Sequence, residues 1–496
     1  MKETILEIKD ECNVRFHNID LEVRRKLVKA LCIKVPYARH TPQYKAGRWD
    51  GTVSFITQGG GTFLNLLDKV LPIISQHGYQ IKIKDNRKEW NFEFDPIDKN
   101  FLSEHTWPKG HRMEGQQIIL EDHQVRAANT YLSELQCVQE ISTGAGKTIL
   151  CAVLSKSIER YGRSVLIVPS KDLVVQTESD FKMLGLDVGV FYGDRKELNH
   201  LHTICTWQSL ESLNKRSKDG LSDIDMSEIT NDVVSVIVDE SHTVQADVLK
   251  RLLTGPFANI PIRIGMTGTV PKEEWNWYSI LSSIGPLRGS VTAKELQDKG
   301  FLANCRIDII QSLETVKYDD WHSELDYLVT DTERIKWLAW TVSEIAKTGN
   351  TLVLVDRIEC GEKLKELISD SIFINGSVKS KKRKEAYDEV NIEDEKVVIA
   401  TYGVAAVGIN IPRIFNLIIV EAGKSFVRTI QSIGRGLRRA SDKDSVRIWD
   451  ITSNCKFSAR HLTERKRNYK DAQYPFKLTK IDRFDHNSKS IIESLI

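Results

Sequence analysis

The chain has 496 residues, of which 41% are hydrophobic and 28% are charged, and its formal net charge is +2. This composition is typical of folded globular proteins and excludes a disordered or polybasic chain, so any nucleic acid must bind in a local groove. The eight cysteines form no CxxC pair, and the longest apolar runs are only as long as a strand. We therefore expect no zinc site, no disulfide framework, no membrane span and a cytoplasmic location, with about three domains.

Residues 1–100 predict a small α+β domain. Apolar and polar residues alternate over 5–18, 52–57 and 79–95, which predicts strands, while 21–31 has helical spacing.

A basic and aromatic segment lies within this domain. Arg39, Lys45 and Arg48 occur close together, and Tyr44 and Trp49 lie between and beside them. Cations mixed with aromatic rings on a glycine-bearing turn suit a phosphate groove with a stacking surface. The alternative is a β-hairpin, and for Trp49 itself we favour that alternative, with the ring as a core anchor.

Residues 101–300 predict the first of two α/β units. Short β-rich runs alternate with helical stretches from residue 133 onward, and strands buried on both faces are typical of a parallel sheet. The expected strands are 137–141, 165–170, 202–206, 233–241 and 262–269.

The run STGAGKT predicts a phosphate-binding loop, because it follows a strand and opens the helix 148–160. Its glycines allow backbone amides to face a phosphate at a helix N-terminus. Lys147 is expected to reach the β- and γ-phosphates of ATP, and the Thr148 hydroxyl to bind Mg²⁺. The nucleotide-binding set is Ser142, Thr143, Gly144, Ala145, Gly146, Lys147 and Thr148. Ile141 occupies the position where such loops begin with Gly or Ala.

The run VSVIVDESH delivers two adjacent acids at the end of an apolar strand. Such a pair is costly to bury unless it meets a cation. We expect Asp239 to hold Mg²⁺ and Glu240 to orient and deprotonate the attacking water. The alternative is a strand that simply ends in a polar turn.

Residues 301–455 predict a second α/β unit, and 456–496 a partly helical extension. A helical pattern at 333–349 precedes strands expected at 351–356, 371–376, 396–401, 415–421 and 445–450, with helices at 361–369 and 379–390. The run QSIGRGLRR places three arginines within five positions, which predicts a bound anion. A nucleic-acid backbone and a nucleotide phosphate are both open on the residues alone.

The ordered runs STGAGKT, VDESH, MTGT, ATYGVAAVGINIP and QSIGRGLRR resemble the motif set of superfamily-two DExH-box helicases. The resemblance spans residues 120–440. It implies an α/β fold of two tandem RecA-like parallel-sheet lobes of the P-loop NTPase class, with ATP between the lobes and nucleic acid across them. It also implies nucleic-acid-stimulated ATP hydrolysis.

The same resemblance implies further site residues. Gln124 matches the adenine-reading glutamine, although Asp122 and His123 beside it depart from the usual residues, and a helix-surface role is the alternative. His242, Thr267 and Thr269 match the segments that couple hydrolysis to lobe movement. Gln431, Arg435 and Arg438 match the motif that reaches the γ-phosphate.

Contacts to nucleic acid and nucleotide are implied at several other positions. Pro169, Ser170, Thr206 and Gln208 match strand-backbone contacts, for which helix capping is the alternative. Thr401 and Gly408 match a motif touching nucleic acid and nucleotide, although Asn410 replaces the family's Asp. Arg357 matches a backbone contact, with capping or ion pairing as the alternative.

The GRWDG run before such a core resembles the N-terminal module of phage recombination and repair helicases. This resemblance implies a monomeric DNA helicase that remodels R-loops, Holliday junctions and stalled forks, together with phage recombination and replication proteins. The alternatives are an RNA helicase, an ATP-gated binding or annealing protein, and the motor of a restriction-type nuclease.

Overall fold

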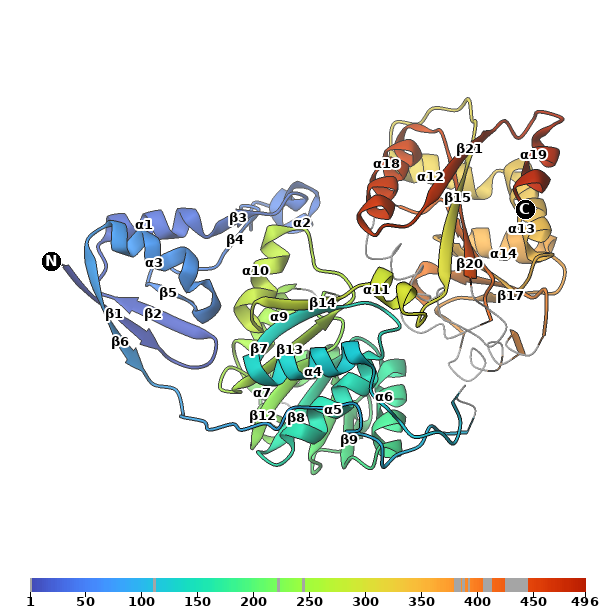
Figure 1. Cartoon of the computed structure of the whole chain (residues 1–496). Coiled ribbons are helices and arrows are strands. Elements are labelled where there is room, and N and C mark those ends of the chain that lie inside the picture. Colours follow the sequence, from blue (N-terminus) through green and yellow to red (C-terminus); the bar gives the residue numbers. More distant parts are fainter. Residues whose placement is uncertain are drawn as a thin grey trace. The chain divides into compact units, whose positions relative to one another are not determined.

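The computed structural model describes residues 2–109, 113–220, 224–242, 246–378, 385, 389–390, 393–404, 413–423 and 445–496. It comprises two compact units (Figure 1). The first contains Met1–Ile141 and Gly146–Val291, and the second contains Ser142–Ala145 and Thr292–Ile496. Most of the helix expected at 379–390, and Gly408, Gln431, Arg435 and Arg438, lie outside the described residues.

The chain begins with a four-stranded sheet in the order β5-β2-β1-β6. β1 pairs antiparallel with β2 and parallel with β6. Helices α1 (Leu21–Ala30) and α3 (Leu67–Gln76) pack on this sheet through Leu27, Val70 and Ile74. The strands are β1 (Lys2–Ile8), β2 (Asn13–His17), β5 (Gly61–Phe63) and β6 (Tyr79–Asp85).

A short hairpin of β3 (Cys32–Lys34) and β4 (Thr52–Ser54) frames the basic segment. Between its strands lie η1 (Ala38–His40) and α2 (Pro42–Lys45). The expected strand at 52–57 is therefore only half as long in the structure, which continues with a bend and a turn toward β5.

The strand expected over 79–95 was wrong beyond Asp85. Residues 86–97 form no strand, although apolar and polar residues alternate over 90–95. The rings of Trp90 and Phe92 stack with centroids 5.5 Å apart, and Phe92 meets Tyr161 edge-on at 5.1 Å. The aromatic side chains of this segment therefore pack on Tyr161, just after α5, and the segment does not pair with a neighbouring strand.

The first lobe contains an eight-stranded sheet in the order β10-β9-β11-β8-β12-β13-β7-β14. All its pairs are parallel except β9 with β10. The strands are β7 (Gln136–Ile141), β8 (Arg163–Val168), β9 (Val188–Tyr192), β10 (Arg195–Lys196), β11 (His202–Thr206), β12 (Val233–Val238), β13 (Ile262–Thr267) and β14 (Leu287–Val291). Most of their residues are buried, as expected for a parallel sheet covered on both faces.

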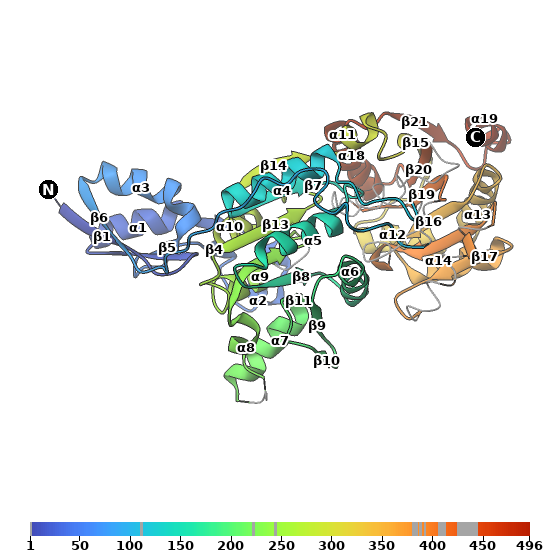
Figure 2. The ribbon, with the colours of Figure 1, turned by 60° about the horizontal axis from the view of Figure 1, so that its bottom comes forward.

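Helices cover both faces of this sheet (Figure 2). One face packs against side chains of α7, α8, α9 and α10 in a single core that includes Val165, Ile167 and Val236. The helices α4, α5 and α6 contact one another in sequence order and cover the other face. Their bounds are α4 (Asp122–Glu134), α5 (Lys147–Ile158), α6 (Lys171–Met183), α7 (Trp207–Lys218), α8 (Met226–Thr230), α9 (Ala246–Leu253) and α10 (Glu274–Ser283).

The N-terminal sheet is joined to the first lobe through the turn between β1 and β2. Glu11 N donates to Ala258 O at 3.0 Å, and Asn13 Nδ2 donates to Thr254 O at 2.9 Å. Arg263 stabilises the part of the first lobe that accepts these bonds. It is fully buried and donates to backbone carbonyls including those of Phe257 and Ser283. These bonds satisfy a guanidinium that would otherwise be costly to bury.

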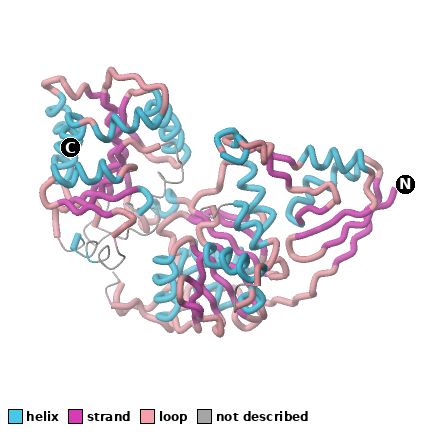
Figure 3. Tube along the Cα trace, turned by 180° about the vertical axis from the view of Figure 1, so that it is seen from behind, coloured by secondary structure: helices cyan, strands magenta, loops and turns pink. Residues whose placement is uncertain are grey.

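The second unit contains a seven-stranded sheet in the order β17-β18-β16-β19-β20-β15-β21, with all pairs parallel. Figure 3 shows the helices around it. The strands are β15 (Asn304–Ser312), β16 (Thr351–Val355), β17 (Ser371–Ile374), β18 (Val397–Thr401), β19 (Asn416–Val420), β20 (Ser445–Ser453) and β21 (Phe476–Ile481). The helices are α11 (Ala293–Asp298), α12 (Trp321–Thr330), α13 (Thr332–Ala346), α14 (Ile358–Leu367), α18 (Lys456–Asp471) and α19 (Ser488–Leu495). The prediction of two successive parallel α/β sheets is confirmed.

The residues after 455 are an integral part of this second unit. β21 adds an edge strand beside β15. From α18, Arg465 forms a bidentate pair with Asp450 at 2.9 Å, and neither side chain is exposed to solvent. Tyr469 donates to the same carboxylate at 2.8 Å. Among the described residues, no helix is long and apolar enough to cross a membrane.

We predict that Arg465→Ala lowers the free energy of unfolding by about 3–5 kcal/mol, because Asp450 is left buried without its cation. Urea denaturation measures the change. Arg467→Ala on the same helix is the control, since Arg467 is 62% exposed in its pair with Glu464, and it should shift stability by less than about 1 kcal/mol. Equal changes in the free energy of unfolding for the two substitutions would show that the buried pair stabilises the fold no more than the exposed pair does.

Candidate nucleotide site

The phosphate-binding loop joins β7 to α5, as the sequence predicts. Gly144 has φ +90° and Gly146 has φ +80°, a left-handed conformation that favours glycine. Gly146 is the N-cap residue of α5 and makes no side-chain capping bond. Helix N-termini of this kind attract anions.

The ammonium of Lys147 lies at the centre of the site. Its Nζ is 2.7 Å from Glu240 Oε1 and donates to Ile141 O at 3.3 Å. Asp239 follows directly after β12, and Glu240 is the next residue. The sheet therefore brings together two residues that lie far apart in the sequence, one predicted to reach the phosphates of ATP and the other to activate the attacking water.

The two acids differ in pKa because their surroundings differ. Burial and the neighbouring Glu240 raise the pKa of Asp239 to about 6. Burial alone would also raise the pKa of Glu240, but Lys147 and His242 lower it to about 2. Glu240 is thus held as a carboxylate, whereas the Asp239 carboxylate is in a setting that a bound divalent cation would stabilise. The donor set therefore fits Mg²⁺.

Glu240 also connects to the segment after β13. Gly268 N donates to Glu240 Oε2 at 3.3 Å. Glu240 itself has φ +48°, which is uncommon for a residue other than glycine and is a sign of backbone strain. The carboxylate is therefore held between the phosphate-loop lysine and the backbone of MTGT.

His242 extends this connection to the threonines. Its Nδ1 lies 2.6 Å from Thr267 Oγ1, and the Thr267 hydroxyl donates to Thr269 O at 2.7 Å. A hydroxyl has one proton, so Nδ1 must be the donor to Thr267. Burial lowers the pKa of His242, which favours the neutral ring. The three predicted coupling residues form one buried chain.

Gln124 lies beside the phosphate-binding loop. It belongs to the first turn of α4, where its Oε1 accepts from Glu121 N at 3.0 Å in a capping box. A Cβ added at Gly146 would lie 2.2 Å from Gln124 Nε2. The amide thus closely approaches the loop, in addition to its capping role.

The predicted nucleic-acid contacts of the first lobe follow β8 and β11. Ser170 and Thr206 are the N-caps of α6 and α7, and their hydroxyls accept from Leu173 N and Ser209 N, each at 3.3 Å. Thr206 is only 3% exposed. Gln208 Nε2 donates to Pro169 O at 3.4 Å. The capping alternative is therefore realised for both hydroxyls.

The basic segment of the N-terminal domain is exposed. Arg39, Lys45 and Arg48 are all exposed to solvent. Trp49 is partly buried against Val35, Ala38, Trp275, Ile33 and Val53, and its Nε1 donates to Thr52 O at 2.7 Å. Trp49 is thus an anchor of the hairpin, while the three cations face solvent.

In the second unit, Arg357 is the N-cap residue of α14, and Thr401 is the last residue of β18. Both are partly buried. The predicted partners Gly408, Gln431, Arg435 and Arg438 lie outside the described part of the chain.

Two backbone groups of the site were not predicted from the sequence. Ile141 O accepts from Lys147, and Gly268 N donates to Glu240. The glycine in MTGT gave no steric signal for the second, since a Cβ there would make only ordinary contacts of 3.7 Å with Glu240 Oε2 and Lys147 Nζ. The Ile141 carbonyl has no sequence signal, because every residue carries one.

Two families match the chain. The family described as "Type III restriction enzyme, res subunit" matches residues 117–272. The family described as "Helicase conserved C-terminal domain" matches residues 333–440.

Similar proteins include ATP-dependent DNA helicase uvsW of Enterobacteria phage T4, which is 21% identical over 464 residues, 86% of each chain. DNA 3'-5' helicase XPB of Mycobacterium tuberculosis is 24% identical over 72% of this chain and 65% of its own length. Among solved structures, S. cerevisiae Dbp5 bound to RNA and ADP BeF3 aligns with a TM-score of 0.52 and 16% identity, over 76% of this chain and 94% of that chain.

We predict that Gly146→Ala lowers the free energy of unfolding by more than Gly78→Ala does. Both glycines have positive φ, but a Cβ meets nothing within 4 Å at Gly78, whereas at Gly146 it meets the Gln124 amide. The control should show the conformational cost alone, about 1–2 kcal/mol. Urea denaturation of both variants measures the difference.

The excess cost at Gly146 should disappear when Gln124→Ala is added, because the clashing amide is then gone. A persistent excess in the double variant would mean that Gln124 does not constrain the loop.

Proposed function

We propose that the chain, which matches a restriction-enzyme res-subunit family and a helicase C-terminal family and resembles a phage DNA helicase, is an ATP-dependent DNA helicase of superfamily two that unwinds and remodels branched DNA. The substrates would be R-loops, Holliday junctions and stalled forks in phage recombination, repair and replication. The similarity to the phage T4 helicase over 86% of both chains supports this substrate class. The exposed basic segment that contains GRWDG supports it as well.

The observation that carries the proposal is the contact of Lys147 with Glu240, and of Glu240 with the backbone of MTGT. In the proposed reaction, backbone amides of Ser142–Thr148 and the Lys147 ammonium hold the phosphates of ATP. Thr148 and Asp239 would hold Mg²⁺, which supplies charge neutralisation at the phosphates. Gln124, next to the loop, would read the adenine.

Glu240 would accept a proton from the attacking water, and its low pKa keeps it in the carboxylate form needed for this role. When Lys147 turns to a phosphate, Glu240 loses its present partner. The change would pass to Gly268 through its hydrogen bond to Glu240, and through His242, whose Nδ1 lies 3.5 Å from Glu240 Oε2, to Thr267 and Thr269. We propose this chain as the route from hydrolysis to movement.

From the second lobe, Gly408, Gln431, Arg435 and Arg438 would complete the nucleotide site, and Arg435 and Arg438 would stabilise negative charge on the γ-phosphate. Arg357 and Thr401 would contact the DNA backbone. We propose that Pro169, Ser170, Thr206 and Gln208 do so from the first lobe, and Arg39, Lys45 and Arg48 from the N-terminal domain. Contacts of this kind position a strand without reading its sequence.

We further propose that the protein acts as a monomer in the host cytoplasm and works beside phage recombination and replication proteins. The deciding experiment measures ATPase activity and strand separation on forks, four-way junctions, R-loops, RNA–DNA hybrids and RNA duplexes. The proposal expects branched DNA and R-loops to be preferred. Equal or greater activity on RNA duplexes would overturn it in favour of an RNA helicase, and binding without strand separation would favour an annealing protein.

We predict that Glu240→Gln binds ATP but hydrolyses it about 10²–10⁴-fold more slowly, because only the proton-accepting group is lost. Nucleotide titration and phosphate release under saturating DNA measure the two properties separately. Near-normal phosphate release by this variant would refute the role of Glu240.

We predict that Arg435→Ala lowers hydrolysis by roughly a thousandfold or more, with little change in DNA affinity, because its guanidinium acts on the γ-phosphate. Arg439→Ala is the control, and it should leave hydrolysis unchanged. If Arg435→Ala instead keeps its ATPase activity and loses DNA affinity, the arginine run binds the nucleic-acid backbone.

A further inference from the structure

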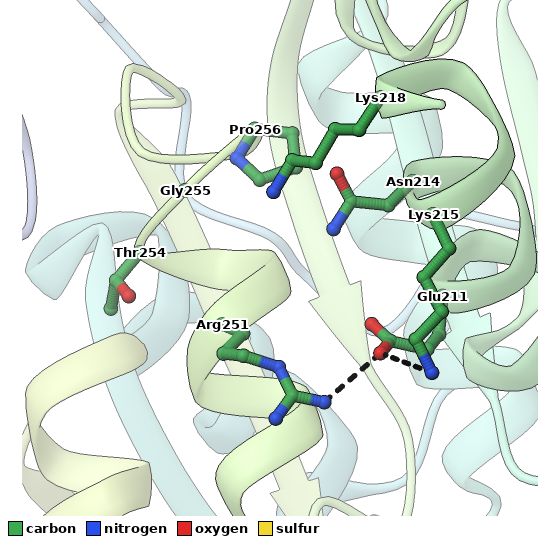
Figure 4. Close-up of a pocket in the computed structure, with 8 residues that line it drawn as sticks. All are labelled: Glu211, Asn214, Lys215, Lys218, Arg251, Thr254, Gly255 and Pro256. Atoms are coloured by element: carbon green, nitrogen blue, oxygen red, sulfur yellow. Dashed lines mark hydrogen bonds and ion pairs between the residues drawn. The ribbon is translucent and has the colours of Figure 1, made fainter. Parts of the chain in front are cut away.

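A basic pocket lies in the first lobe, between the last turns of α7 and the end of α9 (Figure 4). Its volume is about 540 Å³. Helix α7 contributes Glu211, Asn214, Lys215 and Lys218, and α9 with the following turn contributes Arg251, Thr254, Gly255 and Pro256. The three cations and the single carboxylate leave two positive charges in excess.

A buried carboxylate, that of Glu211, positions two of the cations that line the pocket. Glu211 is 8% exposed, and its Oε1 is 2.9 Å from Arg251 Nη2 and 3.2 Å from Lys215 Nζ. One carboxylate thus holds one cation from each helix in place. Asn214, 9% exposed, lies between Lys215 and Lys218 and adds amide hydrogen-bonding groups.

The outer part of the pocket is open to solvent and positively charged. The side chains of Lys215 and Arg251 are 69% and 55% exposed. The Lys218 side chain extends toward Pro256 across the pocket (Figure 4). Glu211 neutralises part of the charge of its two partners, and Lys218 adds a further cation near them. This arrangement suits an anion with several oxygens, such as a phosphate.

The pocket lies at the opposite edge of the sheet from the nucleotide site. Asp239 and Glu240 follow the carboxyl end of β12, whereas α7 begins at the carboxyl end of β11 and leads the chain back toward the amino ends. Lys215 and Lys218 are in the last turn of α7 and therefore lie near the amino ends of the strands. The pocket cannot be a part of the ATP site.

The pocket also adjoins the N-terminal domain. Thr254, which lines it, accepts from Asn13 Nδ2 at 2.9 Å. One helical turn before Thr254, Lys250 lies over the Phe55 ring at 4.7 Å. A polymer that touches this pocket can thus continue along the N-terminal domain, which free phosphate cannot do.

We propose that this pocket binds a backbone phosphate of duplex DNA, as a contact separate from the strand-contacting residues after β8 and β11. The inference rests on the proposed function, since it takes DNA as the ligand. It assigns Lys215, Lys218 and Arg251 as the phosphate-binding residues, and Glu211 as the residue that positions two of them. The contact would hold a duplex arm against the first lobe while the motor acts elsewhere.

The test uses the full chain with Lys218→Ala, and with Lys215→Ala and Lys218→Ala combined. Affinity for a duplex and for a four-way junction is measured over a series of salt concentrations. Each lost phosphate contact should reduce the slope of log K against log salt by about 0.9. ATPase activity at saturating single-stranded DNA should stay at the wild-type level, because the pocket is remote from the nucleotide site.

Lys182→Ala is the matched control. Lys182 pairs with the buried Glu178 at i,i+4, and Arg195 from another element shares that carboxylate, so the local chemistry repeats that of the pocket. The slope should be unchanged in this variant. An equal loss in Lys182→Ala, or an unchanged slope in the pocket variants, would overturn the proposal.

A second arm separates DNA from a free anion. Inorganic pyrophosphate is titrated while the melting temperature is followed in wild type and in Lys218→Ala. Stabilisation that needs Lys218, together with an unchanged DNA slope, would show that the pocket takes a free phosphate compound and would overturn the DNA assignment. Absence of DNA-stimulated ATPase activity in the wild type would refute the proposed function. The salt dependence of duplex binding would still show whether the pocket binds DNA.

Discussion

The ion pair between Lys147 and Glu240 is the interaction on which the candidate nucleotide site of the first lobe depends. An apolar strand that ends in two adjacent acids needs a compensating charge, and here the phosphate-loop lysine compensates one of them at 2.7 Å. The same lysine is the group expected to meet the phosphates of ATP. In the proposed mechanism, nucleotide binding competes with this existing ion pair, and the released carboxylate keeps its bond from Gly268 N and its position beside His242. Under that proposal, nucleotide binding acts on the rest of the lobe through an exchange of the partners of Glu240.

Much of this arrangement was predictable from the sequence. The loop, the acids and the buried strands have strong local signals, because a phosphate loop needs glycines between a strand and a helix and because parallel strands are apolar throughout. The order of the strands was not predictable, since it depends on pairing between distant segments. β21, which lies next to β15 at the sheet edge, comes from a polar segment with partly exposed residues, so its sequence does not resemble that of a buried strand.

Other expectations depended on tertiary partners that the sequence does not reveal. Residues 86–97 alternate like a strand, but Tyr161 takes the place of a strand partner for their aromatic rings. From the sequence, Thr206 could either cap a helix or contact DNA. The structure shows that it caps α7 and is only 3% exposed, and neither fact could be read from the sequence. The pocket at Lys215 was missed because its charges come from α7 and α9, which are separated in the sequence by α8 and β12. No single run of residues contains it.

The attachment of the N-terminal sheet has a mechanical consequence. The N-terminal domain contacts the ATP-binding lobe through the hydrogen bonds of Glu11 and Asn13 and through the edge-on rings of Phe55 and Tyr278. The segment after β6 makes a further contact, where Phe92 meets Tyr161 edge-on. Because these contacts come from different segments of the N-terminal domain, a rotation of that lobe during the hydrolysis cycle would carry the N-terminal sheet along as long as the contacts hold.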